Sequence, residues 1–96
     1  MDKTTIVQQL EDFKRKNEAK YKIKELGLFG SFAKDKATAQ SDIDICVKSD
    51  NIDLFVFVHL KEDLEEILGK KVDLIRLRET MNVDLKSKIN KEAIFV

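Results

Sequence analysis

The sequence predicts a small α+β domain, and three observations carry that prediction. Its 96 residues suit one compact domain, because single domains usually run to about 100 to 150 residues. Segments with the period of an amphipathic helix alternate along the chain with segments typical of β-strands. With 43% hydrophobic and 38% charged residues, the composition is that of a globular chain rather than a disordered one. We therefore expect residues 1–96 to form a single domain.

Charge and cysteine content exclude several classes of protein. The 18 basic and 18 acidic residues cancel, so no overall field attracts polyanions, and direct nucleic-acid binding is not expected. The single cysteine, Cys46, allows no internal disulfide, and together with His59 it leaves too few ligands for a closed zinc site. The sequence contains no apolar run of signal-peptide or membrane-spanning type, which predicts a cytoplasmic protein without a membrane partner.

The first third of the chain predicts a helix followed by a strand. Between about Thr5 and Lys20, apolar residues recur at steps of three and four, as in a helix that buries one face. The next segment, 23–29 (IKELGLF), is typical of a strand. We expect this strand to end at Gly30, because a residue without a side chain lets the backbone turn sharply.

A second strand is predicted at 42–48 (DIDICVK), after a small and polar stretch at 32–40 that suits a short helix or loop. Successive side chains of a strand point to opposite faces, so Asp42, Asp44 and Cys46 share one face. The aliphatic residues between them are expected to face the core.

The second half of the chain predicts a helix, a strand and a further helix. Residues 54–68 have helical period, and Gly69 suits the C-terminal cap of that helix. A third strand is predicted at 71–77 (KVDLIRL) and a last helix at 83–89, followed by the apolar tail 93–96.

Three carboxylates carry the predicted chemistry. Asp42 and Asp44 are two positions apart on one strand, which places them about 6 to 7 Å apart on the same face. If Asp73 lies on a neighbouring strand, the three side chains converge, and they repel one another unless a cation neutralises them. Oxygen ligands favour hard cations, and Mg²⁺ prefers few protein carboxylates together with substrate phosphates.

The turn at Gly30 and Ser31 is the predicted phosphate-binding element. Backbone N–H groups at a strand-to-helix turn can surround an anion, and the missing side chain of Gly30 allows close approach. The hydroxyl groups of Ser31 and Ser41 add donors.

These features together resemble a known family. The stretch GSFAKDKATAQSDID at 30–44 and the later VDL at 72–74 are similar to the motifs of the nucleotidyltransferase fold in the DNA polymerase β superfamily. The resemblance covers roughly residues 26–77 and is strongest to the minimal nucleotidyltransferases, which are often encoded beside a HEPN-domain partner. It implies an α+β nucleotidyltransferase fold, with a small mixed β-sheet and helices packed on one side.

The resemblance also implies a reaction, in which a hydroxyl attacks the α-phosphorus of ATP or another nucleoside triphosphate and pyrophosphate leaves. Asp42, Asp44 and Asp73 would then be catalytic and would hold two Mg²⁺ ions, Asp42 and Asp44 contacting both and Asp73 one. Lys34 stands where the family often has arginine, and lysine lacks the bidentate grip of a guanidinium. The implied nucleotide-binding residues are Gly30, Ser31, Lys34 and Ser41.

The acceptor suggested by the resemblance is a HEPN-type toxin, which would make this chain an antitoxin that assembles with itself or with its partner. Two other functions remain open. The first is a non-catalytic antitoxin that neutralises its partner by forming a complex. The second is a small-molecule nucleotidyltransferase, disfavoured because such enzymes resemble this core with an added domain.

Four other features have simpler interpretations. Cys46 is expected to be a small buried residue, and His59 a residue on a helix surface or facing a partner. The basic run at 14–16 predicts a solvated helix end. Residues 54–58 are apolar all round, more than one core contact needs, which predicts a protein interface.

Overall fold

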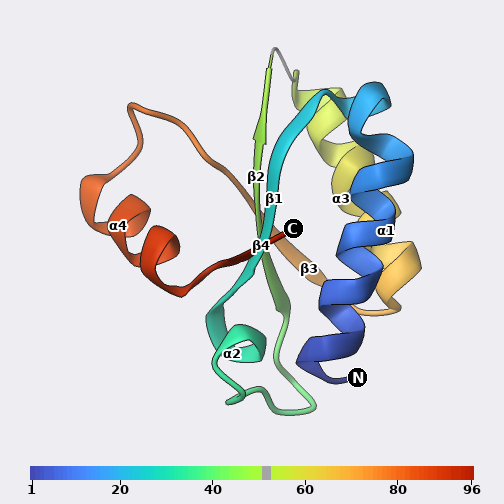
Figure 1. The fold of residues 1–96 in the computed structure, drawn as a ribbon, viewed down its shortest axis with the longest axis vertical. Helices are drawn as coiled ribbons and strands as arrows, with labels where there is room; N and C mark the ends of the chain where they lie inside the picture. Colours follow the sequence, from blue (N-terminus) through green and yellow to red (C-terminus); the bar gives the residue numbers. More distant parts are fainter. Residues whose placement is uncertain (51–52) are drawn as a thin grey trace.

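The computed structural model describes residues 1–50 and 53–96, which form a four-stranded mixed sheet with helices (Figure 1). The strands lie in the order β3-β2-β1-β4; β2 and β3 are parallel, and the other neighbouring pairs are antiparallel. The small α+β fold with a mixed sheet is therefore confirmed. The elements are α1 (Lys3–Tyr21), β1 (Ile23–Phe29), α2 (Gly30–Ala33), β2 (Ile43–Ser49), α3 (Leu54–Leu68), β3 (Val72–Arg76), α4 (Val83–Glu92) and β4 (Ile94–Phe95).

The ends of the two long helices follow from local hydrogen bonding. The carboxylate of Asp2 accepts a hydrogen bond from the backbone N–H of Thr5 and caps α1. Asp53 caps α3 in the same way. At its other end α3 stops at Gly69, whose φ of 67° is left-handed, and this confirms the predicted glycine cap.

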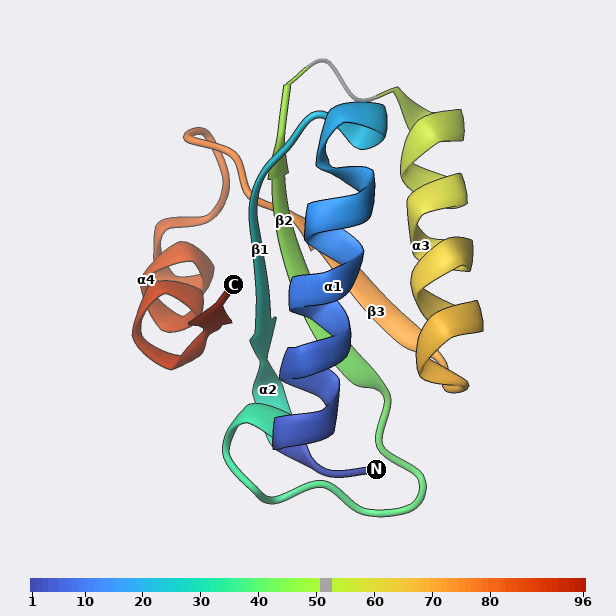
Figure 2. The same ribbon diagram turned by 45° about the vertical axis from the view of Figure 1, so that its right-hand side comes forward.

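The larger core lies between the sheet and the pair α1 and α3, which run side by side over one face (Figure 2). The aliphatic residues of β2 point into it, as their alternation predicted, and Ile43, Ile45 and Val47 are fully buried. Burial of a leucine or isoleucine side chain is worth about 1.5 to 3 kcal/mol, so this face supplies most of the driving force for folding. The helices contribute Ile6, Leu10, Phe13, Leu60, Leu64 and Leu68 to this core.

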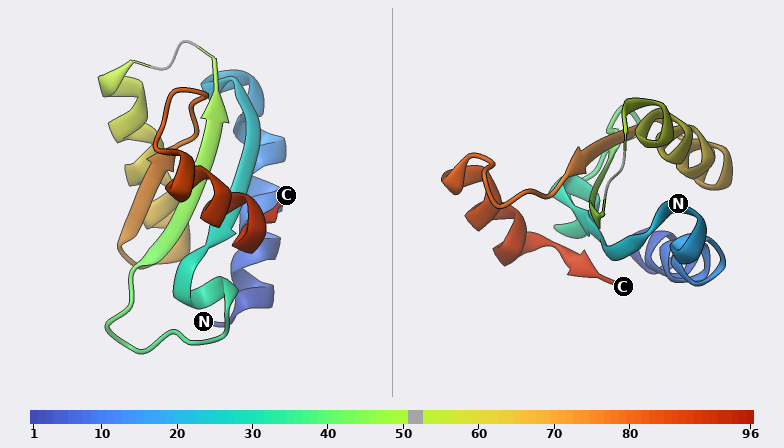
Figure 3. Two further views of the ribbon diagram at one scale, coloured as in Figure 1. Left: turned by 90° about the vertical axis from the view of Figure 1, so that its left-hand side faces the viewer. Right: turned by 90° about the horizontal axis from the view of Figure 1, so that it is seen from above.

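The fourth helix covers the opposite face, where it crosses β2 and β1 (Figure 3). Its fully buried Ile89 packs with Phe29 and Cys46 in a second, smaller cluster. The expectation that the helices pack on one side therefore holds for α1 and α3 and is wrong for α4. The physical reason is that β1 and β2 also present apolar side chains on this face, and these need cover.

The apolar tail forms an edge strand that the sequence did not predict. Residues of β4 pair with β1, with Phe95 opposite Gly27. A Cβ atom on Gly27 would lie 2.9 Å from the ring of Phe95 and 3.0 Å from the sulfur of Cys46, so the glycine is what lets the ring approach the sheet.

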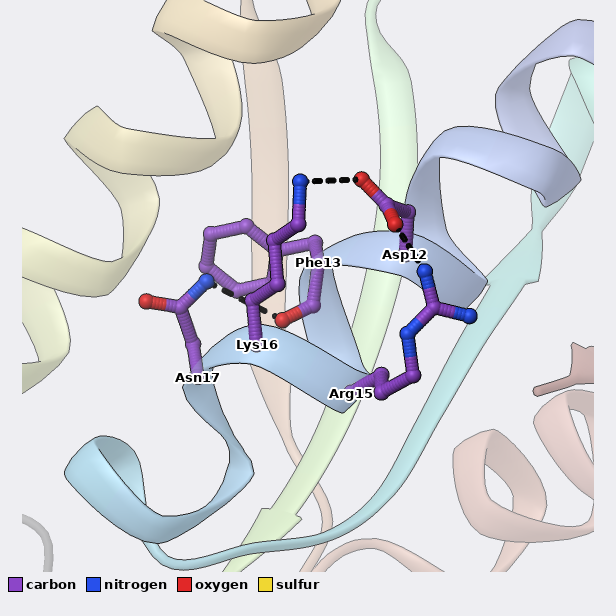
Figure 4. A network of polar contacts seen from close by, with 5 residues as sticks. All are labelled: Asp12, Phe13, Arg15, Lys16 and Asn17. Carbon is purple, nitrogen blue, oxygen red and sulfur yellow. Dashed lines mark hydrogen bonds and ion pairs between the residues drawn. The ribbon is translucent and has the colours of Figure 1, made fainter.

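Each residue of the basic run 14–16 on α1 has a partner within the protein, and Figure 4 shows those of Arg15 and Lys16. The carboxylate of Asp12 pairs with Arg15 and, at 3.0 Å, with the ammonium of Lys16, and all three side chains are exposed. The ammonium of Lys14 donates to the backbone oxygen of Val96. Arg15 and Lys16 are solvated, as predicted, but the run lies within α1 rather than at a helix end, and Lys14 is half-buried. None of the helices in the described part of the chain has the length and apolar character needed to cross a bilayer.

Candidate active site

The three aspartates meet at one end of the sheet. Asp44 is the second residue of β2 and Asp73 the second of β3, and the register of these parallel strands places them directly opposite each other. Neighbouring strands lie about 4.8 Å apart, so the two side chains leave the same face as close neighbours. Asp42 stands immediately before β2. Asp44 is two residues before Cys46 on β2, so Asp44 and its neighbour Asp73 leave the sheet on the face that carries α4.

The carboxylates interact electrostatically. The pKa of Asp44 is raised, first by burial and then by the negative charges of Asp73 and Asp42, and a hydrogen bond between the Asp44 and Asp73 side chains raises it further. Asp44 is half-buried, whereas Asp42 and Asp73 are exposed. The site is thus an open cluster of negative charge that a cation would stabilise.

The donor set suits magnesium, although the three carboxylates do not form a closed ligand shell. Across residues 1–50 and 53–96, no three carboxylate, imidazole or thiol groups lie in an arrangement that could hold a metal ion. Carboxylates without a cation repel one another, and a bound ion would draw their oxygens inward. Asp42, Asp44 and Asp73 offer only carboxylate oxygens, the ligand type that Mg²⁺ prefers.

The turn between β1 and α2 lies against these carboxylates. Gly30 has a φ of 72°, and a Cβ atom there would lie 2.0 Å from the Asp44 carboxylate oxygen Oδ2. The position therefore requires glycine both for its backbone conformation and for space. The next residue, Ser31, donates its backbone N–H to the carboxylate of Asp44, which lowers the pKa of that group against the larger raising effects.

Two of the predicted nucleotide-binding side chains have partners inside the protein instead. The ammonium of Lys34 lies 2.9 Å from the carboxylate of Glu92 at the end of α4. The hydroxyl of Ser41 accepts the backbone N–H of Thr38 and closes the loop before β2. Either side chain could still contact a nucleotide only through what these partners leave: for Lys34 the ammonium donors that do not face Glu92, and for Ser41 its own O–H. Sequence reasoning did not find Glu92, because no local pattern links α2 to α4.

The remaining sequence predictions concern residues outside the cluster. Cys46 is fully buried, its thiol lies 3.6 Å from the backbone oxygen of Gly27, and burial raises the pKa of the thiol to about 11, which confirms a buried filler. His59 is exposed on α3, as expected of a helix-surface residue. Leu54 and Phe55 are 73% and 79% exposed, so the apolar segment is on the surface, and its use as an interface stays a prediction.

The family, sequence and structure comparisons all relate this chain to nucleotidyltransferases. Residues 8–96 match the family described as polymerase beta, nucleotidyltransferase. A protein of Methanocaldococcus jannaschii, assigned as a protein adenylyltransferase, is 45% identical over 80 residues, or 80% of each chain. A solved structure assigned as a minimal nucleotidyltransferase superposes with a TM-score of 0.81 at 28% identity, covering 98% of this chain and 95% of the other. A chain from a mutant of the MntA-HpeT toxin–antitoxin complex has a TM-score of 0.65 at 25% identity, covering 100% of this chain and 71% of that one.

Proposed function

Because the chain belongs to the polymerase β nucleotidyltransferase family, we propose that it transfers AMP from ATP to a hydroxyl group of a partner protein. The observation that carries the proposal is the pairing of Asp44 with Asp73 across two parallel strands, beside a turn that glycine alone can form. The M. jannaschii relative, assigned as a protein adenylyltransferase, supports AMP as the group transferred.

In this proposal the chain's own residues bind and orient the reactants. Asp42 and Asp44 would hold both Mg²⁺ ions and Asp73 one of them, in accord with an all-carboxylate donor set. The bound ions would neutralise charge on the triphosphate and favour the ionised acceptor hydroxyl. The missing side chain of Gly30 makes room for the Asp44 carboxylate, and the neighbouring backbone would orient the triphosphate so that the acceptor hydroxyl and the pyrophosphate are in line at the α-phosphorus.

The proposed acceptor is a HEPN-type toxin, with this chain acting as its antitoxin. Support comes from the fold shared with the toxin–antitoxin relative and from the exposed apolar residues at the start of α3, which suit a protein partner. The same exposed residues favour the second candidate, an antitoxin that acts by complex formation alone. The two candidates differ in whether the carboxylates are needed.

The test is to incubate the chain with Mg²⁺, the candidate HEPN partner and ATP labelled at either the α- or the γ-phosphate. We expect protein-bound label from the α position only, and we expect Asp44→Asn to remove it while Asp12→Asn, which disrupts ion pairs on α1, keeps it. Label from the γ position would indicate a kinase and contradict the proposal. No label with the wild-type chain, despite a stable complex, would favour the non-catalytic antitoxin.

A further inference from the structure

We propose that Glu92 is a positioning residue of the active site: through Lys34 it fixes α2, and with it the Gly30–Ser31 turn, against Asp44. The effect of Glu92 on the active site rests on the proposed function, whereas the ion pair between Glu92 and Lys34 is independent of it. It assigns Lys34 to holding the turn in place rather than to binding the triphosphate.

Lys34 and Glu92 form a partly buried ion pair. The ammonium of Lys34 and the carboxylate oxygen Oε1 of Glu92 are 2.9 Å apart, and the two side chains are 38% and 23% exposed. By comparison, Asp12, Asp35 and Asp50 pair with cations while 45% to 68% exposed. The other oxygen of Glu92, Oε2, is buried and has no hydrogen-bond partner among the described residues. A poorly solvated carboxylate depends strongly on its one cation, so this pair holds its two elements together more firmly than a surface pair does.

Glu92 belongs to a helix that packs firmly on the sheet. Its helix, α4, is held to the sheet by the fully buried Ile89, which packs against Phe29 and Cys46. Phe29 is the residue directly before Gly30. The anchor and the turn are therefore attached to the same part of the sheet.

The helix α2 is short, and few of its side chains are buried. It consists of four residues, of which Phe32 alone is buried. Lys34 follows directly and donates its backbone N–H to the backbone oxygen of Gly30, so a pull on Lys34 is transmitted to the turn by one hydrogen bond. Because the Asp44 carboxylate occupies the position that a Cβ atom of Gly30 would take, small movements of α2 change the contact between the turn and Asp44.

These contacts favour a holding role for Lys34 over direct contact with the triphosphate. The ammonium of Lys34 has three N–H donors, but its charge is already paired with the partly buried carboxylate of Glu92. Any movement of Lys34 towards a phosphate would weaken that pair, which opposes nucleotide binding. A lysine that holds α2 keeps its partner throughout.

The experiment compares Glu92→Gln, Lys34→Gln, the double variant and the charge exchange Lys34→Glu with Glu92→Lys. Two quantities are measured: amide hydrogen exchange over residues 31–36 in the chain alone, and the affinity for Mg·ATP by calorimetry. The matched control is Asp35→Asn, which breaks the exposed ion pair with Lys3 next to the same turn. Melting temperatures show whether each variant is folded.

We expect either single variant to speed exchange and weaken Mg·ATP binding by roughly three- to tenfold, with no further loss in the double variant. The charge exchange should recover most of both quantities, and the control should leave both unchanged.

The proposal is overturned if hydrogen exchange in Glu92→Gln matches that of the wild type. It is also overturned if the charge exchange restores hydrogen exchange but not Mg·ATP affinity, because the lysine charge itself would then be the nucleotide ligand. If Glu92→Gln fails to fold, the double variant and the charge exchange decide the question. Absence of AMP transfer by the wild type would contradict the proposed function alone, since hydrogen exchange requires neither nucleotide nor acceptor.

Discussion

The two faces of the sheet are built from the same strands and serve opposite purposes. On the face under α1 and α3, β2 presents Ile43 and Ile45, both fully buried. On the other face the same strand presents Asp44 and Cys46, of which the first belongs to the carboxylate cluster and the second to the small core under α4. The alternation of a strand thus separates the residues that stabilise the fold from those that form the site.

The difference between the faces lies in how completely they are covered. Two long helices close one face, whereas the ten-residue α4 closes only part of the other and leaves the start of β2 and β3 open. In the open part, partial burial and then the like charges of Asp73 and Asp42 raise the pKa of Asp44, an arrangement that opposes folding. A change on the covered face should therefore alter stability, and a change on the open face should alter activity.

The largest effect is expected on the covered face. Ile45→Ala removes a fully buried side chain between the sheet and its helices and should lower the free energy of unfolding by about 2 to 5 kcal/mol. Urea denaturation measures this loss. Activity per folded molecule should stay near that of the wild type, and a proportional loss of activity in fully folded protein would show that the faces are not independent.

On the open face, Asp73→Asn should reduce the rate of AMP transfer by about 100-fold or more while leaving the stability of the fold unchanged or slightly higher. The side chain of Asp73 is exposed, and its removal relieves repulsion with Asp44. Single-turnover transfer and calorimetric Mg·ATP binding separate the two roles: the rate should fall much more than the affinity. An equal loss in both would contradict the proposal that Asp73 holds only one Mg²⁺ ion, the one that favours the ionised acceptor hydroxyl.

The contrast between the faces also explains which features could be predicted from the sequence. Local patterns sufficed for the long elements: apolar residues at helical spacing predicted α1 and α3, and strict alternation predicted β2 with its correct faces. The convergence of Asp44 and Asp73 was also foreseeable once the second and third strands were taken to be neighbours.

The features that escaped prediction depend on contacts between distant segments. β4 has only two residues, Ile94 and Phe95, and is a strand because it pairs with β1 at Gly27. The side of the sheet that α4 covers is decided by where Ile89 finds apolar partners. The partner of Lys34 depends on that placement, so it could not be read from local sequence.

Two glycines offer a matched test of intermediate size. Gly30 and Gly69 have φ values of 72° and 67°, but a Cβ atom at Gly69 meets nothing within 4 Å, whereas one at Gly30 collides with Asp44. Alanine at either position should cost about 1 to 2 kcal/mol of stability through the left-handed backbone. Only Gly30→Ala should also reduce transfer, by about tenfold or more, because it displaces an active-site carboxylate. Equal activities of the two variants in a transfer assay would show that the turn does not adjoin the reacting groups.

The smallest effect concerns the stability of the site itself as pH changes. Because the pKa of Asp44 in the folded chain is raised above its ordinary value, the folded state binds the proton more tightly than the unfolded state does. The contribution of Asp44 to stability is therefore most favourable below about pH 4 and is lost as pH rises through the folded pKa. Asp44→Asn, which stays neutral, should consequently melt at a higher temperature than the wild type at about pH 7, and the difference should shrink towards about pH 3.5.

Added Mg²⁺ should raise the melting temperature of the wild type more than that of the variant, since an ion stabilises the charged cluster that asparagine weakens. Thermal unfolding at several pH values with and without Mg²⁺ measures both changes; a wild-type advantage that grows with pH in the absence of metal would show that charge repulsion does not destabilise the open face.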